Sequence, residues 1–470
     1  MCAAFLFPMI LDEYAADILW ALATLPSKSE QYRKAQEYYD GIHPLNFATR
    51  RYREAFGRLF AALSLNVCAT VIDTKVARLK LEGFSFVSQN EDDAQPTEEA
   101  QAGLQQQARK IGRRTREVWR HNRMDKRLKR VLSEALLKGD SYVIAWPDAQ
   151  GRAVFHPNAA GLVVVKEDTE NPGFIVFAAK AWREGKRIRL TLYYPDKLVK
   201  LVTAVECVSM PRTVAAFKQY QEEREPWPLP NPWGKVPVFH LGDGDSHLKN
   251  LFKIQDALNK AICDKMIAME FQAFRQRWAT GLELPTDPIT GIAYNPFKPG
   301  AENLWVIPDG EHAKFGDFAE ANLEQFIKVK ESFIADFALV SGIPIYAFKL
   351  SGDIPSGESL KVLDKRLADQ VEDIQTSEGD TLCDLMRFAL QIEGEENVDL
   401  EAQWKDTSPR NELEFAQTQT AKKAWGVSNR QLQIEAGYKE DEIARMDGER
   451  QDETQAAGAL MGGLFNAGQV

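Results

Sequence analysis

The sequence predicts an α+β fold that is predominantly α-helical. Two observations support this. Apolar side chains recur every three or four residues in long segments between 12 and 138 and again beyond 247. Residues 141–202 instead alternate with a period of two and are rich in β-branched and aromatic residues. A chain of 470 residues exceeds what one hydrophobic core holds, so we expect several structural regions.

Composition excludes several classes of protein. The net charge is −10, and hydrophobic and charged contents of 44% and 27% are typical of a folded chain. The five cysteines are scattered and never in CxxC spacing, which argues against a disulfide framework or a zinc site. No apolar run approaches the roughly 20 residues of a membrane span, and no Lys or Arg precedes Lys28, so a signal peptide is not expected. We expect a soluble protein, made in the cytoplasm, that contacts no membrane.

The N-terminal part predicts a series of helices. A longer helix is expected from Arg109 to Lys138, ending at Gly139. Residues 83–102 hold acidic residues and no Lys or Arg, and predict a mobile acidic loop. The shorter helices are expected at Asp12–Thr24, Ser27–Tyr39, Ala48–Leu63 and Val67–Leu81.

A basic run begins the helix predicted at 109–138. Such a run can bind phosphate. A solvated helix face, or a face that pairs with acidic surfaces of a neighbouring subunit, is the more common reason for such a run where no groove-reading motif is present, and the sequence leaves these alternatives open. The basic patch comprises Arg109, Lys110, Arg113, Arg114, Arg116, Arg120 and Arg123, and basic residues continue to Arg130.

The period-two region, 141–205, predicts an antiparallel or mixed sheet. Residues 225–238 contain too many prolines for a helix or a strand and predict a rigid extended connector. The expected strands are Ser141–Trp146, Gly161–Lys166, Phe174–Ala179, Ile188–Tyr194 and Lys197–Val202.

Two amphipathic helices follow, at His247–Arg277 and Ala321–Gly342. On the first, Lys253, Asp256, Lys260 and Asp264 lie opposite the apolar stripe. The prolines and glycines of 280–317 cannot continue either helix.

A loop rich in Pro and Gly leads from the second amphipathic helix into a third and longer one. This helix runs to Gly394 and would span on the order of 50 Å. Past it, Glu395–Trp404 predicts a strand, and 409–424, 427–436 and 440–447 predict short helices.

Motifs for catalysis are lacking in the sequence. It contains no HExxH, no Walker A and no GxGxxG pattern. The histidines are isolated, so a histidine general base would have no orienting partner. We therefore expect no catalytic residue, no metal site and no cofactor.

Four passages, in this order, resemble the SPP1-type portal protein family of tailed bacteriophages, in particular the branch common in actinobacterial phages. The resemblance extends over about nine-tenths of the chain. The sequence departs from the family pattern at Ile345, where a second proline often follows the first, and has Lys349 at a variable loop position. The four passages are Glu37–Leu45, Asn231–Val238, Ser341–Leu360 and Trp425–Ile443.

The resemblance implies a portal fold. Its wing would be 1–243, its stem helices 244–277 and 319–342, and its clip 278–318. A tunnel loop at 343–356, a long crossing helix at 357–394 and a helical crown with the C-terminal tail at 395–470 would follow.

The resemblance also implies a function. Portal proteins form a closed ring, usually of twelve subunits, at one capsid vertex of the virion, through which double-stranded DNA passes during packaging and ejection without sequence specificity. The expected partners are the terminase large subunit, the major capsid protein and scaffold, and a head-completion adaptor. Energy would come from a separate ATPase, because this chain has no nucleotide motif.

Three sets of residues are expected to serve this function. A bore dense in Lys and Arg would hold DNA tightly, so mixed charges are expected along the stem. The stem candidates for the channel, or for contacts between subunits, are Lys253, Asp256, Lys260 and Asp264; the tunnel-loop candidates are Ile345, Tyr346, Lys349, Asp353 and Ser356; the clip candidates for docking are Trp278, Leu284, Phe297 and Trp305.

Two alternatives remain at this stage. One is a metal-dependent nucleic-acid-processing enzyme whose basic run binds its substrate. It would need acids converging at strand ends, whereas Asp148 and Asp196 fall in predicted turns. The other is a different capsid-associated structural protein.

Overall fold

The computed structural model describes residues 11–87, 98–171, 173–222, 225–273, 277–280, 286–292, 314–317, 322–348, 357–396, 398–405, 412–437, 443, 445–446 and 448–450. Helices predominate among them, and strands form four separate sheets. The α+β class predicted from the sequence is confirmed. The chain divides into two compact units, one of residues 1–352 and 369–404, the other of 353–368 and 405–470.

The helices follow the predicted periodicity closely. Their bounds are α2 Ala15–Ser27, α3 Ser29–Tyr39, α4 Arg50–Leu63, α5 Cys68–Arg78, α6 Glu98–His121, α7 Met124–Lys138, α8 Phe252–Ala273, α9 Leu323–Ser341, α10 Gly357–Ile392, α11 Glu412–Ala424 and α12 Asn429–Glu435.

The strands are shorter and include several that the sequence did not predict. Their bounds are β1 Leu81–Phe86, β2 Ser141–Pro147, β3 Ala153–Asn158, β4 Val163–Glu167, β5 Ile175–Glu184, β6 Arg187–Tyr193, β7 Lys197–Thr203, β8 Phe217–Gln219, β9 Leu229–Pro230, β10 Val238–Leu241, β11 Arg277–Thr280, β12 Lys314–Asp317 and β13 Leu400–Trp404.

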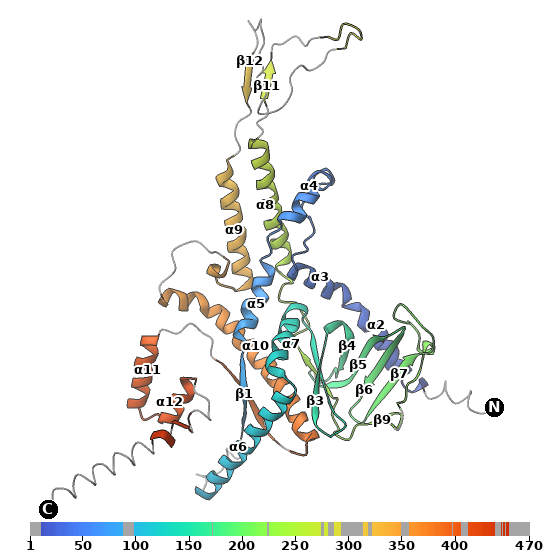
Figure 1. Ribbon diagram of the computed structural model, residues 1–470, viewed down its shortest axis with the longest axis vertical. Coiled ribbons are helices and arrows are strands. Elements are labelled where there is room, and N and C mark those ends of the chain that lie inside the picture. Colours follow the sequence, from blue (N-terminus) through green and yellow to red (C-terminus); the bar gives the residue numbers. More distant parts are fainter. Residues whose placement is uncertain are drawn as a thin grey trace, which may run out of the picture. The chain divides into compact units, whose positions relative to one another are not determined.

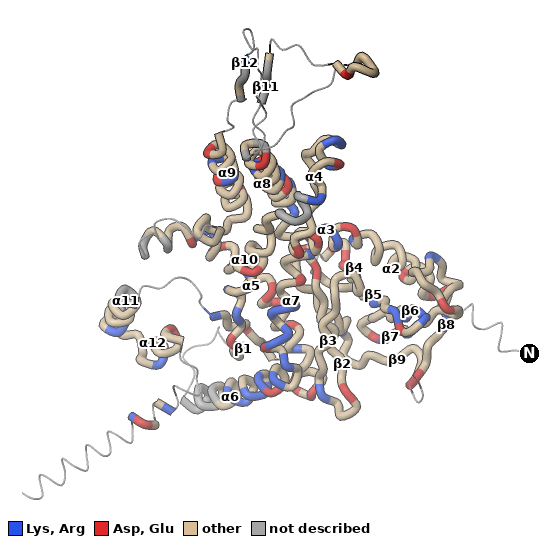
Figure 2. Tube along the Cα trace, turned by 45° about the horizontal axis from the view of Figure 1, so that its top comes forward, with Lys and Arg blue, Asp and Glu red and all other residues tan. Residues whose placement is uncertain are grey.

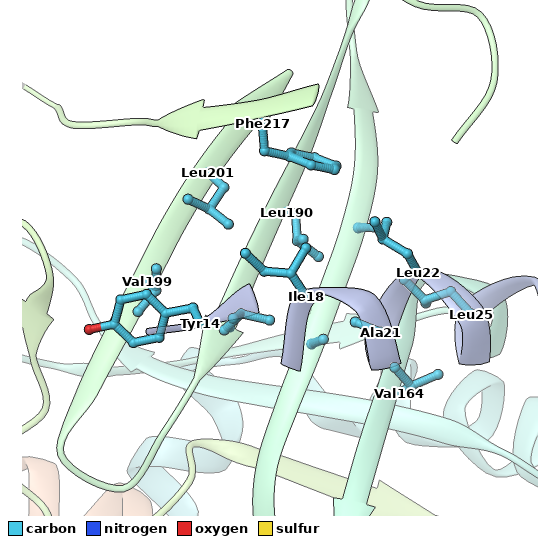
Figure 3. Packing of buried hydrophobic residues seen from close by; sticks show 13 residues of the cluster. Tyr14, Ile18, Ala21, Leu22, Leu25, Val164, Leu190, Val199, Leu201 and Phe217 are labelled. Atoms are coloured by element: carbon cyan, nitrogen blue, oxygen red, sulfur yellow. The ribbon is translucent and has the colours of Figure 1, made fainter. Parts of the chain in front are cut away.

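The central sheet of the first unit is antiparallel in the order β4-β5-β6-β7-β8, with β9 also paired to β7. Helix α2 lies across one of its faces (Figure 3). Ile18 and Leu22 of α2 pack there against Leu190, Leu192 and other buried side chains of the sheet. Burying such side chains is worth roughly 1.5–3 kcal/mol each, which accounts for the apolar spacing of α2.

The opposite face of the central sheet packs partly against a second sheet, of order β10-β2-β3. Tyr193 and Leu198 of the central sheet meet Tyr142, Ile144 and Val238 in this core. The Pro-rich connector thus leads into β10, a strand that the sequence did not predict and that pairs with β2 in the second sheet.

The helix predicted as one from Arg109 to Lys138 is two helices, α6 and α7. The break occurs at Asn122 and Arg123. The buried amide of Asn122 donates to Ala153 O at 2.9 Å and accepts from Phe155 N at 2.7 Å, both in β3. Arg123 has a left-handed backbone with φ of +52°, which turns the chain into α7.

The predicted acidic loop at 83–102 is also wrong at both ends. Residues up to Phe86 belong to β1, and α6 already begins at Glu98. Strand β1 pairs with β13 in an antiparallel ladder from Leu81↔Trp404 to Phe86↔Leu400. Consequently β13, which we expected in the crown, belongs with the first unit.

In the second unit, α11 and α12 pack together. Lys422 of α11 pairs with Glu435 of α12 at 2.6 Å. Ser428 caps α12 by accepting from Gln431 N at 3.2 Å.

Candidate stem helices and basic surfaces

Helices α8 and α9 form the predicted helix pair. They lie side by side, and the β11/β12 ladder lies beyond the C-terminal end of α8 and the N-terminal end of α9 (Figure 1). Asn322 caps the start of α9 by accepting from Glu324 N at 3.0 Å, and Gly342 ends it with a φ of +72°. Helix α9 buries Ile334 and Phe337, and the ring of Phe337 meets Phe348 at 5.5 Å.

One side of α8 is polar, and most of it is covered by other segments of the chain. We call Gln255, Asp256, Asn259 and Asp264 the α8 polar face. Asp256 is buried and accepts from Tyr38 Oη at 2.8 Å and from Asn46 Nδ2 at 2.6 Å. Because a buried carboxylate is stable only with such donors, these bonds fix the segment after α3 against α8.

The remaining members of the α8 polar face continue this pattern. Gln255 donates to Leu65 O at 2.7 Å and accepts from Val67 N at 3.1 Å. Asn259 accepts from Leu65 N at 2.9 Å. The α8 polar face therefore joins the stem helix to the loops on either side of α4.

Burial at this interface shifts the pKa values of two side chains, Tyr38 and His43. Desolvation raises the pKa of Tyr38 far above its usual range, and the hydrogen bond to Asp256 raises it further. Desolvation lowers the pKa of His43, whose ring lies 5.1 Å from that of Tyr38. Both side chains are neutral at physiological pH, as a buried interface requires.

The four predicted stem residues have different environments. Lys253 is exposed. Asp256 is buried inside the chain, so the expectation that it faces a channel or a neighbouring subunit is wrong for this residue. Lys260 pairs with Asp264 at 2.6 Å, and it lies 4.2 Å from the ring centre of Tyr52. Asp264 also accepts from Tyr52 Oη at 2.7 Å.

The structure reaches only part of the predicted tunnel loop and clip. Ile345 and Tyr346 lie half-buried in a short 3₁₀ helix, Ile345–Ala347. Trp278 is in β11, opposite Gly316 of β12. The other predicted residues, Lys349, Asp353, Ser356, Leu284, Phe297 and Trp305, lie outside the described residues.

The basic patch is divided by the fold. Figure 2 shows basic residues along both α6 and α7. On α6, Lys110 pairs with Glu395 at 2.7 Å and Arg114 pairs with Glu393 at 2.9 Å. This part of the run is therefore bound to acidic residues of the same chain, whereas the sequence had suggested acidic partners only in a neighbouring subunit.

The α6 residues Arg113, Arg116 and Arg120 complete the first part of the run. Arg113 lies 4.0 Å from Glu117 one turn along α6. Surface pairs of this kind contribute roughly 0.3–0.5 kcal/mol each. Arg109, Arg120 and Arg123 are exposed on α6 and at its junction with α7.

The acids considered for an alternative enzyme do not converge. Asp148 closes a tight turn after β2 by accepting from Gln150 N and Arg152 N, both at 2.9 Å. Across the residues that the structure describes, no group of three or more His, Cys, Asp or Glu is placed to hold a metal ion. In the same residues no helix is both long and apolar enough to cross a membrane.

Comparison with protein families gives a match to the model described as "Phage portal protein, SPP1 Gp6-like", over residues 22–456. This chain belongs to that portal family. The portal assignment predicted from the sequence is thereby confirmed, and the family is one of structural proteins of the capsid vertex. The comparison with curated protein sequences returns no match.

Similar solved structures come from particles of the gene transfer agent (GTA). The neck of an empty GTA particle, computed with C6 symmetry, aligns with a TM-score of 0.44 and 13% identity, covering 84% of this portal-family chain and 95% of the other. The neck of a native GTA particle, computed with C12 symmetry, aligns with a TM-score of 0.40 and 14% identity, covering 67% and 80%.

Proposed function

We propose that this portal-family chain assembles into a closed ring of twelve copies that lines a channel for double-stranded DNA at one capsid vertex. The match to the portal family over residues 22–456 carries this proposal. The ring is a virion component assembled from chains made in the bacterial cytoplasm, and it binds the terminase large subunit during packaging and a head-completion adaptor afterwards. The major capsid protein and scaffold surround it.

The surface of α9 supports assembly with further copies. Ile327, Val329 and Val340 are apolar and each is 44–45% exposed. Successive residues of an α-helix are about 100° apart, so Ile327 and Val329 point to nearly opposite sides. Helices that expose apolar side chains on more than one side gain free energy by packing against neighbours, and copies of the same chain around a ring provide such neighbours.

The charges along α8 suit a conduit that does not retain DNA. Lys260 is neutralised by Asp264, and Asp256 is inside the chain. Lys253 contributes one exposed positive charge per copy. A sparse ring of charges gives weak contacts that do not depend on base sequence, because DNA affinity rises steeply with each neutralised phosphate.

The size of the purified full-length protein tests the proposal. Twelve copies of the 53.0-kDa chain weigh about 640 kDa, and we expect rings of that mass by mass photometry and end-on rings by electron microscopy. A 53-kDa monomer under all conditions that assemble phage heads would overturn it. Divalent-dependent cleavage of DNA by the same preparation would favour the nucleic-acid-processing alternative.

The tunnel loop, 343–356, remains a further prediction. We expect Lys349 and Asp353 to lie on a mobile segment that narrows the bore. A deletion that shortens 349–356 should leave the ring intact and impair packaging or retention of DNA. Normal packaging by the shortened variant would contradict this role for the loop.

A further inference from the structure

A cavity of about 630 Å³ lies between the first half of α7 and the strands β2, β3 and β5. Its lining is strongly basic and contains a single carboxylate, Glu134. That carboxylate is already occupied, because it accepts from Lys138 Nζ and from Ala160 N, both at 3.0 Å. The positive side chains around the cavity are Arg123 before α7, Lys126, Arg127 and Arg130 of α7, and Lys180 of β5.

These five cations differ from Lys110, Arg113 and Arg114 of α6, which have acidic partners within the chain. Among the described residues, none of the five makes an ion pair. Arg127 donates from Nη1 to Phe155 O at 3.2 Å, and Lys180 lies 4.8 Å from the ring centre of Trp182. The first part of the basic run is thus partly neutralised within the chain, whereas the cations around this cavity make no ion pair among the described residues.

Local electrostatics make an anion favourable at this cavity. Arg123 immediately precedes α7, and Lys126 and Arg127 lie in its first turn, where the helix dipole is itself positive, so their charges add to it. Partial burial lowers the pKa of Lys180. The pKa of His156, on the cavity wall, is lowered by desolvation and then by the charges of Lys180 and Arg127. A bound anion would relieve this repulsion.

A second cavity, of about 410 Å³, adjoins the first and shares His156 and Lys180 with it. It is lined by the aromatic rings of Trp146, Trp182 and Tyr220. Its other cations are already neutralised: Arg189 pairs with Glu184, and Lys200 pairs with Glu225 at 2.6 Å. The guanidinium of Arg189 already covers the ring of Tyr220 at 3.5 Å, and the carboxylate of Glu222 also lines this cavity, 3.7 Å from Lys200. The rings of Trp146 and Trp182 therefore provide the apolar surface beside the charge of the first cavity.

We propose that the two cavities together bind a nucleotide unit, with its phosphate against α7 and its base among the aromatic side chains. Guanidinium and ammonium groups bind phosphate oxygens through charge-assisted hydrogen bonds. Aromatic rings bind bases of any sequence by stacking. A base paired within a duplex cannot reach the second cavity, so the ligand is a free nucleotide or an unpaired strand.

The test measures binding of a short fluorescein-labelled oligothymidylate to the full-length protein by fluorescence anisotropy. The double variant Lys126→Glu/Arg130→Glu should weaken binding at least about tenfold and reduce the slope of log K against log salt by about one to two. The control is Lys129→Glu, which reverses one positive charge, half the change of the double variant, on an exposed residue of the same helix outside the cavity lining. This control should bind like the unaltered protein, and both variants should keep its thermal unfolding midpoint.

A second variant tests the aromatic half. Trp182→Leu should weaken oligothymidylate binding about tenfold but leave the affinity for inorganic phosphate, measured by competition, unchanged. Equal losses for both ligands would overturn the assignment of the base to the second cavity.

Competitors distinguish the sources of the phosphate. Competition by thymidine monophosphate identifies a free nucleotide as sufficient, whereas competition only by unlabelled oligonucleotide identifies a strand. The proposal is overturned if Lys129→Glu loses as much affinity as the double variant. It is also overturned if polyglutamate competes as well as the oligonucleotide, since the cavity would then bind an acidic protein segment.

Discussion

Asp256 is the residue whose position differs most from what its neighbours in the sequence indicate. In a helix with Lys253, Lys260 and Asp264 it has the spacing of an exposed charged face. The structure instead buries it against Tyr38 and Asn46, which lie more than 200 residues away. Periodicity cannot separate a polar face in water from one bonded to a distant segment, because both need the same side chains at the same spacing.

The substitution Asp256→Ala tests this interface. It removes the acceptor for Tyr38 and Asn46 and leaves both groups buried without a partner, so we expect a loss of about 3 kcal/mol in the free energy of unfolding, measured by urea denaturation. The matched control is Asp264→Ala, whose side chain is 35% exposed and can be replaced by water. Its loss should be about 1 kcal/mol. Equal losses for the two variants would contradict the burial of Asp256.

Glu378 of α10 provides a prediction about pH. One of its oxygens accepts from Gly242 N at 2.9 Å, while the other is buried without a hydrogen-bond partner among the described residues. Burial raises its pKa from 4.5 to about 7, partly opposed by the bond from Gly242. Between these two values the folded chain keeps a proton that the unfolded chain has lost, so stability falls as the pH rises from 4.5 to 7.

The variant Glu378→Gln should remove that dependence. We expect it to match the unaltered chain near pH 4 and to be more stable at pH 8, by up to about 3 kcal/mol, in urea denaturation at each pH. Glu372→Gln, at an exposed position of the same helix, serves as the control and should leave the curve unchanged. Parallel curves for Glu378→Gln and the unaltered chain would show that Glu378 is not held protonated.

At the scale of elements, the end of α7 and the loop before α8 meet by close backbone approach. Gly139 ends α7 with a φ of +86°, and a Cβ there would lie 2.5 Å from Asp245 N. Gly244 N donates to Gly139 O at 2.8 Å, and His247 N donates to Leu136 O at 3.0 Å. The start of the stem is thus attached to α7 through the main chain, where no side chain can fit.

Gly139→Ala should therefore be strongly destabilising. It combines a left-handed backbone with a clash against backbone atoms that cannot rotate away, and we expect a loss above about 2 kcal/mol in thermal or urea unfolding. Gly151→Ala is the control, because that glycine also has a positive φ, of +76°, but a Cβ added there would meet no atom within 4 Å. The control should lose only about 1 kcal/mol. A similar loss at both positions would mean that backbone conformation alone matters at Gly139.

The sequence predicted the elements unevenly, for physical reasons. The long helices α8, α9 and α10 were placed within a few residues, since their apolar spacing is sustained over many turns. Strands β3 and β10 were missed because they are short, contain or follow proline, and are stabilised by pairing with β2. Likewise β1 depends on a partner, β13, that lies more than 300 residues away.

The candidate sites were also predicted only where they depend on local sequence. The basic run was recognised, but its division into a neutralised part on α6 and a cavity lining on α7 depends on Glu393, Glu395 and the sheet. No local pattern records which acids come close in three dimensions. The signal that could have suggested the division is Asn122, an uncharged residue within the basic run that is a poor helix former and precedes the left-handed Arg123.

At the scale of the whole molecule, the exposed apolar side chains of α9 predict where copies of the chain meet. Val329→Glu places a charge in the expected contact and should shift the assembly toward smaller species in mass photometry, with at least about a tenfold loss of rings. Ser332→Glu introduces the same charge at an exposed polar position of the same helix and should assemble normally. Normal rings from Val329→Glu, or equal loss from both, would remove α9 from the contact between copies.

The pairing of β1 with β13 also bears on how the protein is made. Strand β1 leaves the ribosome early, but its partner is synthesised only after more than 300 further residues. At elongation rates of about 5–20 residues per second, that edge stays open for about 15–60 s. During that time β1 can pair with strands of other nascent chains on the same messenger RNA. A chaperone that shields the edge of β1 would therefore raise the yield of correctly folded subunits.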